Sequence, residues 1–121
     1  MTLARYRILV VEDQFMLAQD ICNELEEAGA EVIGPEPSLE RALARIAQEP
    51  HIDGAVLDIS LGDGTSFPIA DLLTERNVPF LFASGYDDEA VADLYPHAVS
   101  CAKPLDMPVL IRTMADIIKP A

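Results

Sequence analysis

Apolar residues gather in five short runs along the chain, and between these runs they recur every three or four positions. Short apolar runs bounded by turn-forming residues are typical of strands buried in a sheet. The expected strands cover residues 7–12, 31–34, 55–58, 79–84 and 98–102. The helical spacing between them predicts helices over residues 14–28, 38–50, 66–76, 87–95 and 106–118.

In four of the expected helices the apolar residues form one well-defined inward face. These positions are Ala18, Ile21, Cys22, Leu25 and Ala28; Leu39, Ala42, Leu43, Ile46 and Ala47; Phe67, Ala70 and either Leu72 or Leu73; and Leu110, Ile111, Met114, Ile117 and Ile118. Gly29 is typical of a C-terminal helix cap, whereas Ser38 and Asp106 are typical N-terminal caps. The second strand is expected to stop at Pro35 and to lie at an edge of the sheet, because proline cannot donate to a central ladder.

Strands that alternate with helices through short connections predict an α/β fold, with a parallel sheet covered on both faces. The 121 residues suffice for one domain, expected to span residues 1–121, and no repeat or linker divides them. The net charge of −13 disfavours direct binding of nucleic acid and insertion into a membrane. The apolar run at Ile8–Val11 is too short for a signal peptide, so a cytoplasmic protein is expected. Cys22 and Cys101 lack CxxC spacing and are expected to be reduced thiols of the core.

Four of the expected strands end in a residue that can do chemistry. The first strand ends in the acidic pair Glu12 and Asp13, the third in Asp58, the fourth in Ser84 and the fifth in Lys103. Parallel strands end at the same edge of a sheet, so these groups are expected to converge, with Asp13 facing Asp58 if the strand order is 2-1-3-4-5. Each residue taken singly has an ordinary role as a cap, a turn residue or a solvated charge. Their occurrence as a set in this order favours a functional site.

The motifs at these strand ends resemble those of the receiver domain of two-component response regulators, over the whole chain. The motifs are Val10-Val11-Glu12-Asp13, Leu57-Asp58-Ile59-Ser60-Leu61, Phe82-Ala83-Ser84-Gly85-Tyr86 and Lys103-Pro104. The resemblance implies a flavodoxin-like (βα)5 sandwich with strand order 2-1-3-4-5. It also implies that Asp58 accepts a phosphoryl group, that Glu12 and Asp13 hold a divalent metal, that Ser84 is the switch hydroxyl, and that Lys103 contacts the phosphoryl group.

The same resemblance implies further features of the site and its partners. Mg²⁺ would be the cofactor, held by Asp58 and the backbone carbonyl of Ser60 as well as by the acidic pair, and the bond between Lys103 and Pro104 would be cis. A sensor histidine kinase or a histidine phosphotransfer protein would donate the phosphoryl group. The chain would then signal by docking to a downstream protein. It would not be an enzyme beyond supporting its own phosphorylation and slow autodephosphorylation.

Electrostatics supports a cation at this edge independently of the resemblance. Two like charges about 6 Å apart repel by roughly 3 kcal/mol at an effective dielectric constant of about 20. Three carboxylates multiply this cost, which a purely structural role would not require. A hard cation would relieve the repulsion, and Mg²⁺ typically takes one or two carboxylates together with water and phosphate oxygens.

The sequence departs from the common receiver pattern in two places. Many receivers have an aromatic residue three positions before the lysine, where this chain has Ser100. The segment ending in Ser84 instead resembles the variant receivers with a Phe-Ala-Thr-Gly signature, with serine in place of threonine. The loop after Asp58 contains Gly62 where proline is common, and the early glycines predict a more mobile loop. Tyr86 is positioned to overhang the site or simply to pack at a helix start, and His51 and His97 are expected to be solvated.

Other function classes fit the motifs less well. A haloacid-dehalogenase-like phosphatase needs a second aspartate two residues after the nucleophile, and Ser60 occupies that position. A nucleotide-binding domain needs a glycine-rich phosphate loop after the first strand, where Glu12, Asp13 and Gln14 stand instead. The remaining alternative is a receiver fold that acts as a phosphorylation-independent interaction module, which the missing aromatic residue at position 100 keeps open.

Overall fold

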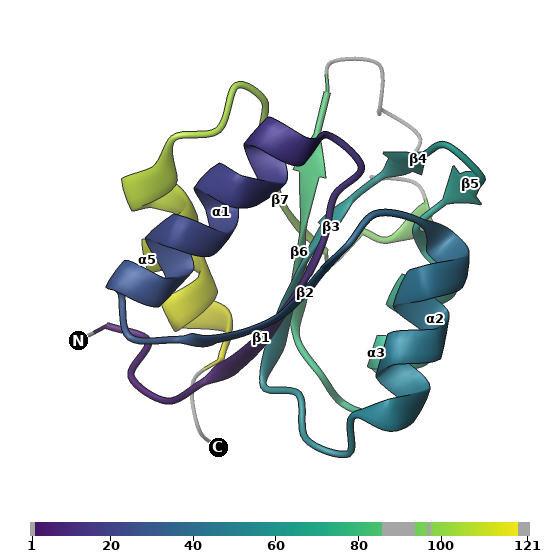
Figure 1. Cartoon of the computed structure of the whole chain (residues 1–121), viewed down its shortest axis with the longest axis horizontal. Coiled ribbons are helices and arrows are strands. Elements are labelled where there is room, and N and C mark those ends of the chain that lie inside the picture. Colours follow the sequence, from purple (N-terminus) through teal and green to yellow (C-terminus); the bar gives the residue numbers. More distant parts are fainter. Residues whose placement is uncertain (1, 86–93, 97, 119–121) are drawn as a thin grey trace.

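A five-stranded parallel sheet forms the centre of the computed structural model, which describes residues 2–85, 94–96 and 98–118 (Figure 1). The strand order β2-β1-β3-β6-β7 corresponds to the order 2-1-3-4-5 of the expected strands, and every neighbouring pair is parallel. The flavodoxin-like fold is therefore confirmed. The strands of this sheet are β1 (Arg7–Val11), β2 (Glu31–Glu36), β3 (Gly54–Asp58), β6 (Phe80–Ser84) and β7 (Val99–Ala102).

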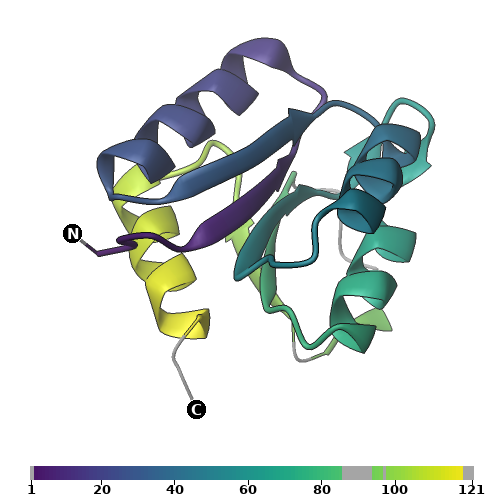
Figure 2. The same ribbon diagram turned by 60° about the horizontal axis from the view of Figure 1, so that its bottom comes forward.

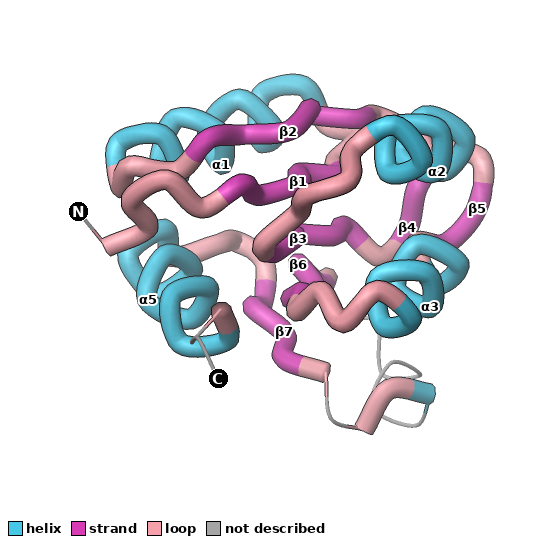
Figure 3. The backbone as a smooth tube through the Cα atoms, turned by 90° about the horizontal axis from the view of Figure 1, so that it is seen from below, coloured by secondary structure: helices cyan, strands magenta, loops and turns pink. Residues whose placement is uncertain are grey.

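The helices of the described residues lie in pairs on the two faces of the sheet, and the resulting layers are clear when the molecule is turned (Figures 2 and 3). On one face lie α1 (Phe15–Glu27) and α5 (Met107–Ile117), and on the other lie α2 (Leu39–Gln48) and α3 (Phe67–Glu75). Alternate residues of the strands point into the two resulting cores. For example, Ile8 and Val10 of β1 pack on the α1 and α5 side, whereas Leu9 and Val11 pack on the α2 and α3 side.

The central strand β3 is fully buried along its length, as its unbroken apolar sequence predicts. The expected inward faces of α1 and α5 are also confirmed, with Ile21, Leu25, Leu110 and Met114 fully buried. On α2 the prediction is wrong at Ala47, which is exposed, because Ala42 and Ile46 form the buried stripe and Ala47 lies at its margin in the last turn.

Two helices end in the same backbone motif. Gly29 follows α1 with a φ of 98°, and the amides of Gly29 and Ala30 donate to the carbonyls of Glu26 and Leu25 at 3.0 Å. These bonds satisfy carbonyl groups that a helix end leaves free, as expected for a glycine cap. Asn77, with a φ of 58°, occupies the same position after α3. Asparagine is one of the few other residues that tolerates this conformation.

The edge strand β2 is longer than predicted. It continues through Pro35 to Glu36, so the prediction that it stops at the proline is wrong, although its edge position is confirmed. Gly34 has a φ of 102° and the pairing with β1 shifts register there, which lets the strand resume beyond the proline. The amide of Glu12 then donates to the carbonyl of Glu36 at 3.1 Å.

A short antiparallel hairpin, β4 (Ser60–Leu61) paired with β5 (Gly64–Thr65), follows the central strand where the glycines predict a more mobile loop. Figure 1 shows it beside the start of α2. At its base, the amide of Ser66 donates to the carbonyl of Ile59 at 2.8 Å. A strand of two residues is too short to show a hydrophobic repeat, so the sequence pattern could not predict this hairpin.

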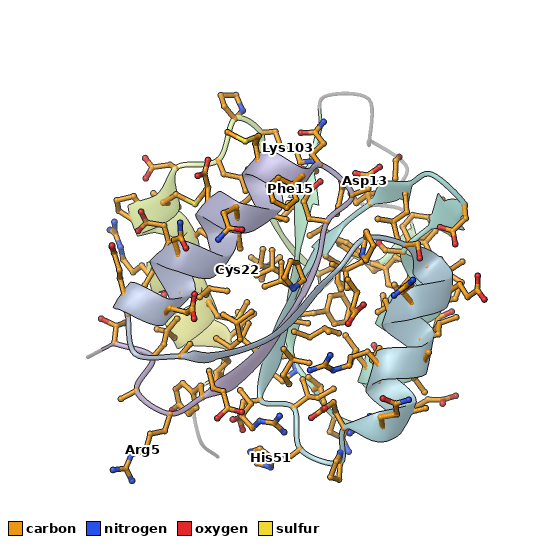
Figure 4. The ribbon with its side chains drawn as sticks, viewed as in Figure 1. Arg5, Asp13, Phe15, Cys22, His51 and Lys103 are labelled. Atoms are coloured by element: carbon orange, nitrogen blue, oxygen red, sulfur yellow. The ribbon has the colours of Figure 1, made fainter. Side chains whose placement is uncertain are left out.

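An ionic cluster joins three segments at the amino ends of the strands. The Arg7 guanidinium lies 2.7 Å from carboxylate oxygens of both Glu31 and Glu49, and it donates to the carbonyl of His51 at 2.8 Å. His51 is exposed, as expected, and lies 3.0 Å from Asp53. Figure 4 shows His51 at the end of the molecule opposite Asp13 and Lys103.

Several remaining expectations concern thiols, membrane spans and segments outside the described residues. Cys22 is buried on the inner face of α1 (Figure 4), Cys101 is half-buried, and both are free thiols. In the described part of the chain, no helix has the length and apolar character needed to cross a bilayer. The expected helix at 87–95, apart from its last residues, and the predicted roles of Tyr86 and His97 fall outside the described residues.

Candidate functional site

The carboxyl ends of the parallel strands bring the predicted site residues to one edge of the sheet. Val11 pairs with Leu57, so the residues that follow β1 stand beside Asp58 at the end of β3. Asp58 pairs with Ala83, and Ser84 pairs with Ala102, which places Ser84 and Lys103 on the same edge. Figure 4 shows Asp13 and Lys103 close together there.

Three carboxylates form a cluster at this edge. Each of Glu12, Asp13 and Asp58 offers an oxygen atom, and these atoms lie within 4.8 Å of one another. Glu12 and Asp58 are buried, with 2% and 7% of their surfaces exposed, whereas Asp13 is exposed. The amide of Gln14, at the start of α1, donates to Glu12 Oε2 at 3.2 Å and fixes that side chain.

Lys103 is the one basic side chain that the structure describes in contact with this cluster. Its Nζ lies 3.1 Å from Asp58 Oδ1 and 3.3 Å from Glu12 Oε1. The strand pairing positions its backbone, because the amide of Lys103 donates to the carbonyl of Ser84 at 2.8 Å. The bond from Lys103 to Pro104 is cis, as the resemblance implies.

Burial and crowding change the proton affinities of these groups. Burial, followed by the hydrogen bond with Asp58, raises the pKa of Glu12 to about 7. Burial also raises the pKa of Asp58, although its hydrogen bonds with Glu12 and Lys103 oppose this effect. Burial alone would lower the pKa of Lys103, but contacts with Asp58 and Glu12 outweigh it and raise that pKa, so the ammonium stays charged. Near neutral pH the two buried acids can therefore share a proton.

The donor set fits a hard divalent cation. All of the available ligand atoms are carboxylate oxygens, which Mg²⁺ prefers over nitrogen and sulfur ligands. Glu12 Oε1 is buried and accepts no hydrogen bond from the described residues, so it lacks a partner other than the Lys103 ammonium. A cation at the cluster would supply that partner and neutralise charge that one lysine leaves uncompensated. Glu12, Asp13 and Asp58 are the residues that could hold it.

The remaining predicted residues lie around this cluster. Ser84 is half-buried at the end of β6, one position beyond the residue that pairs with Asp58. Ser60, whose backbone carbonyl is the expected additional metal ligand, lies in the β4–β5 hairpin, two residues beyond Asp58. Ser100 is exposed on β7. The position that often carries an aromatic side chain in receivers therefore presents a small polar group to solvent.

Sequence reasoning missed two apolar side chains beside the site. Phe15 and Met16 begin α1 directly after the acidic residues, and they are 77% and 75% exposed. Figure 4 shows Phe15 at the same end of the molecule as Asp13 and Lys103. The sequence could have indicated their exposure, because Phe15 and Met16 fall outside the inward face of the helix. That face is formed by Ala18, Ile21, Cys22 and Leu25. Exposed side chains of this size next to a reactive edge are suited to contact with another protein.

Comparison with known proteins supports the assignment of the fold. A receiver protein from Sinorhizobium medicae is 24% identical, with a TM-score of 0.86, and the match covers 94% of each chain. SdrG from Sphingomonas melonis is 31% identical, with a TM-score of 0.80, over 98% of this chain and 99% of that one. No family model matches the sequence.

Similarity in sequence to a curated regulator also supports the assignment to receiver domains. The phyllosphere-induced regulator PhyR of Methylorubrum extorquens is 35% identical over 101 residues, or 80% of this chain. This chain spans only 38% of the length of that relative. The strand order, the acidic cluster with its lysine, and these similarities together show that the chain belongs to the receiver domains of response regulators.

Proposed function

We propose that the chain accepts a phosphoryl group on Asp58 in a Mg²⁺-dependent reaction, and that it passes the signal on by docking to a protein. The observation that carries this proposal is the geometry around Asp58. Its carboxylate lies at the end of the buried strand β3, within 4.8 Å of the Glu12 and Asp13 carboxylates and 3.1 Å from Lys103 Nζ. A nucleophilic oxygen next to both a cation-binding cluster and a fixed ammonium is what phosphoryl transfer requires.

The proposed reaction needs little covalent chemistry from the protein. A carboxylate oxygen of Asp58 attacks the phosphorus atom, the bond from phosphorus to the donor nitrogen breaks, and the nitrogen keeps the electron pair and takes up a proton. The product is an acyl phosphate on Asp58. Lys103 would stabilise charge on the phosphoryl oxygens, and the Ser84 hydroxyl would donate a hydrogen bond to one of them. Bound Mg²⁺ would supply further charge neutralisation and orientation.

The chain itself would catalyse only slow loss of the group. Water would attack the phosphorus atom, the bond to Asp58 would break, and inorganic phosphate would leave with the carboxylate restored. We assign no other enzymatic activity to the chain. The phosphoryl donor in this proposal is a sensor histidine kinase or a histidine phosphotransfer protein. The exposed Phe15 and Met16, which follow Asp13 at the start of α1, offer it an apolar contact.

A second function has one specific observation in its favour. Many receivers report their phosphorylation state through an aromatic residue at the position that Ser100 occupies on β7. This chain therefore lacks that aromatic residue and has an exposed serine there. A receiver fold of this kind could bind its partner in the same way whether or not Asp58 is modified. The two proposals differ in whether phosphorylation changes affinity for the partner.

Intact mass spectrometry tests the primary proposal. The wild type and Asp58→Asn would be incubated with Mg²⁺ and acetyl phosphate, and separately with a phosphorylated histidine phosphotransfer protein. We expect the wild type to gain one phosphoryl group and the Asn variant to gain none, because the amide nitrogen and oxygen are poor nucleophiles. Chelation of Mg²⁺ should abolish the gain.

A matched control guards against labelling elsewhere. Asp20→Asn makes the same chemical change at an exposed position of α1, away from the cluster, and should be labelled like the wild type. Labelling of Asp58→Asn to the wild-type extent would overturn the assignment of the acceptor. No labelling of the wild type by either donor would favour the phosphorylation-independent module.

A further inference from the structure

The hairpin that follows Asp58 is anchored at its base, along its inner side and at its tip. Its base is closed by the bond from the amide of Ser66 to the carbonyl of Ile59. Ile59 and Leu61 are buried in the core beneath α2 and α3. Gly64 approaches Leu39 at the start of α2, where an added Cβ would lie 3.4 Å from Leu39 Cδ2. The segment between the phosphoacceptor and α3 is therefore held against the neighbouring helix.

The tip of the hairpin bonds directly to the amino end of α2. Asp63 Oδ1 accepts from the amide of Leu39 at 2.9 Å, and Asp63 Oδ2 accepts from the amide of Glu40 at 3.2 Å. These two bonds lower the pKa of the Asp63 carboxyl, so it is ionised at neutral pH. A negative charge at the positive end of a helix dipole adds to the attraction. One side chain thus joins two elements that are 24 residues apart.

Helix α2 does not need Asp63 as its ordinary cap, because it already has one. Ser38 Oγ accepts from the amide of Arg41 at 3.2 Å, and the Ser38 carbonyl accepts from the amide of Ala42. Asp63 completes this arrangement by taking the first two helical amides, so the amides of Leu39, Glu40 and Arg41, which have no acceptor within the helix, all have partners. Both Ser38 and Asp63 cap α2, but only Asp63 belongs to the hairpin and so connects the hairpin to the helix.

We propose that Asp63 is a positioning residue for the metal and phosphoryl site, which it serves by fixing the hairpin that carries Ser60. This inference rests on the proposed function, in which the Ser60 carbonyl completes the ligand set of Glu12, Asp13 and Asp58. Asp58 ends the buried strand β3, but Ser60 is exposed and lies beyond that strand, in a hairpin of only two residues on each side. So short a hairpin is not stable without support from its surroundings. The contact of Asp63 with α2 supplies that support at the end opposite the base.

The expected consequence is a loss of Mg²⁺ affinity when Asp63 is changed. Groups that orient metal ligands without touching the metal typically contribute ten- to a hundredfold to affinity. Asp63 acts on one ligand out of several, so we expect Asp63→Ala to weaken Mg²⁺ binding by about tenfold, at the lower end of that range. Asp63→Asn retains one oxygen acceptor for the helix amides and should lose less.

Calorimetric titration with Mg²⁺ and urea denaturation would be run on both Asp63 variants and on two controls. Ser38→Ala removes a cap from the same helix without touching the hairpin. It should lower the urea midpoint but leave Mg²⁺ affinity unchanged. Glu40→Gln removes one negative charge from the same exposed region without removing an acceptor from the helix amides. It reports how much of any loss is a general effect of charge.

The outcomes separate this inference from the proposed function. Weaker Mg²⁺ binding in the Asp63 variants, together with wild-type Mg²⁺ affinity in both controls, would support the positioning role. An equal loss of Mg²⁺ affinity in Ser38→Ala would overturn it, because the loss would then follow from the stability of α2. An equal loss in Glu40→Gln would overturn it as a general effect of charge. Wild-type affinity in the Asp63 variants would also overturn it and leave the proposed function intact. Failure of the wild type to bind Mg²⁺ would remove the proposed function itself, and the inference with it.

Discussion

The raised proton affinity of Glu12 leads to a prediction about stability, pH and metal. Without metal, the folded chain holds a proton on Glu12 up to about pH 7, whereas the ordinary pKa of the carboxyl is 4.5. Between these values only the folded state keeps the proton, so stability is lost as pH rises through this window. At 1.36 kcal/mol for each unit of pKa, the loss is roughly 3 kcal/mol. That is a large part of the 5–15 kcal/mol typical of a whole domain.

Urea denaturation of the wild type and Glu12→Gln in metal-free buffer at pH 5 and pH 8 would measure this loss. The amide has nearly the same shape and does not titrate, so acidic groups outside the Glu12 and Asp58 pair contribute equally to both proteins. We expect the free energy of unfolding of Glu12→Gln, relative to the wild type, to increase by roughly 2–3 kcal/mol between the two pH values, slightly less than the full loss because pH 5 already lies above the ordinary pKa of 4.5. A difference that stays constant or moves the other way would refute the assignment of a raised pKa to Glu12.

Addition of Mg²⁺ should reverse the loss in the wild type. The cation binds ionised carboxylates and stabilises the folded state in proportion to the logarithm of its concentration above the dissociation constant. The gain should be large at pH 8 and small at pH 5, where a proton competes for Glu12. Glu12→Gln should gain less at both pH values, because it lacks one of the three carboxylates. A gain in the wild type that did not depend on pH would contradict binding at this cluster.

Two further predictions concern the fold. Gly34→Ala should destabilise the chain by roughly 1–3 kcal/mol in urea denaturation, because φ at Gly34 is 102° and an added Cβ would lie 2.8 Å from the amide nitrogen of Glu36. Gly62→Ala, where an added Cβ meets nothing within 4 Å, should have little effect, and equal losses at both sites would contradict the explanation. Tyr95→Phe should cost about 1 kcal/mol, because the Tyr95 hydroxyl donates to Asp71 Oδ1 at 2.6 Å. Unchanged stability, measured in the same way, would show that this bond contributes nothing net.

The fold was largely predictable because its strands are short, apolar and buried, and their separation by helices leaves few possible topologies. The errors arose where tertiary context outweighed local preference. Pro35 was expected to end β2, yet an edge strand tolerates a proline next to a register shift. Ala47 was placed in the core because it extends an apolar stripe, but it lies in the last turn of α2, at the margin of the buried stripe formed by Ala42 and Ile46.

The site was predictable to the extent that parallel strands end at a common edge. This geometry brings Glu12, Asp13, Asp58 and Lys103 together, and their order along the chain is enough to expect it. The support around them was not predictable. The bonds of Asp63 to the start of α2 join residues 24 positions apart, and neither residue type nor spacing specifies that contact. Local patterns describe elements, whereas such bonds depend on how the elements pack.

The ionic cluster around Arg7 has a consequence for the opposite end of β1. Arg7 begins that strand and Glu12 directly follows it, so the two ends are separated by about 17 Å at 3.3 Å for each residue. Arg7 is also paired with its own acidic neighbours, Glu31 and Glu49. Because Arg7 is held by these carboxylates at the far end of the strand, we expect that the charge changes of the proposed function, from protons, cations or a phosphoryl group, leave the Arg7 cluster in place.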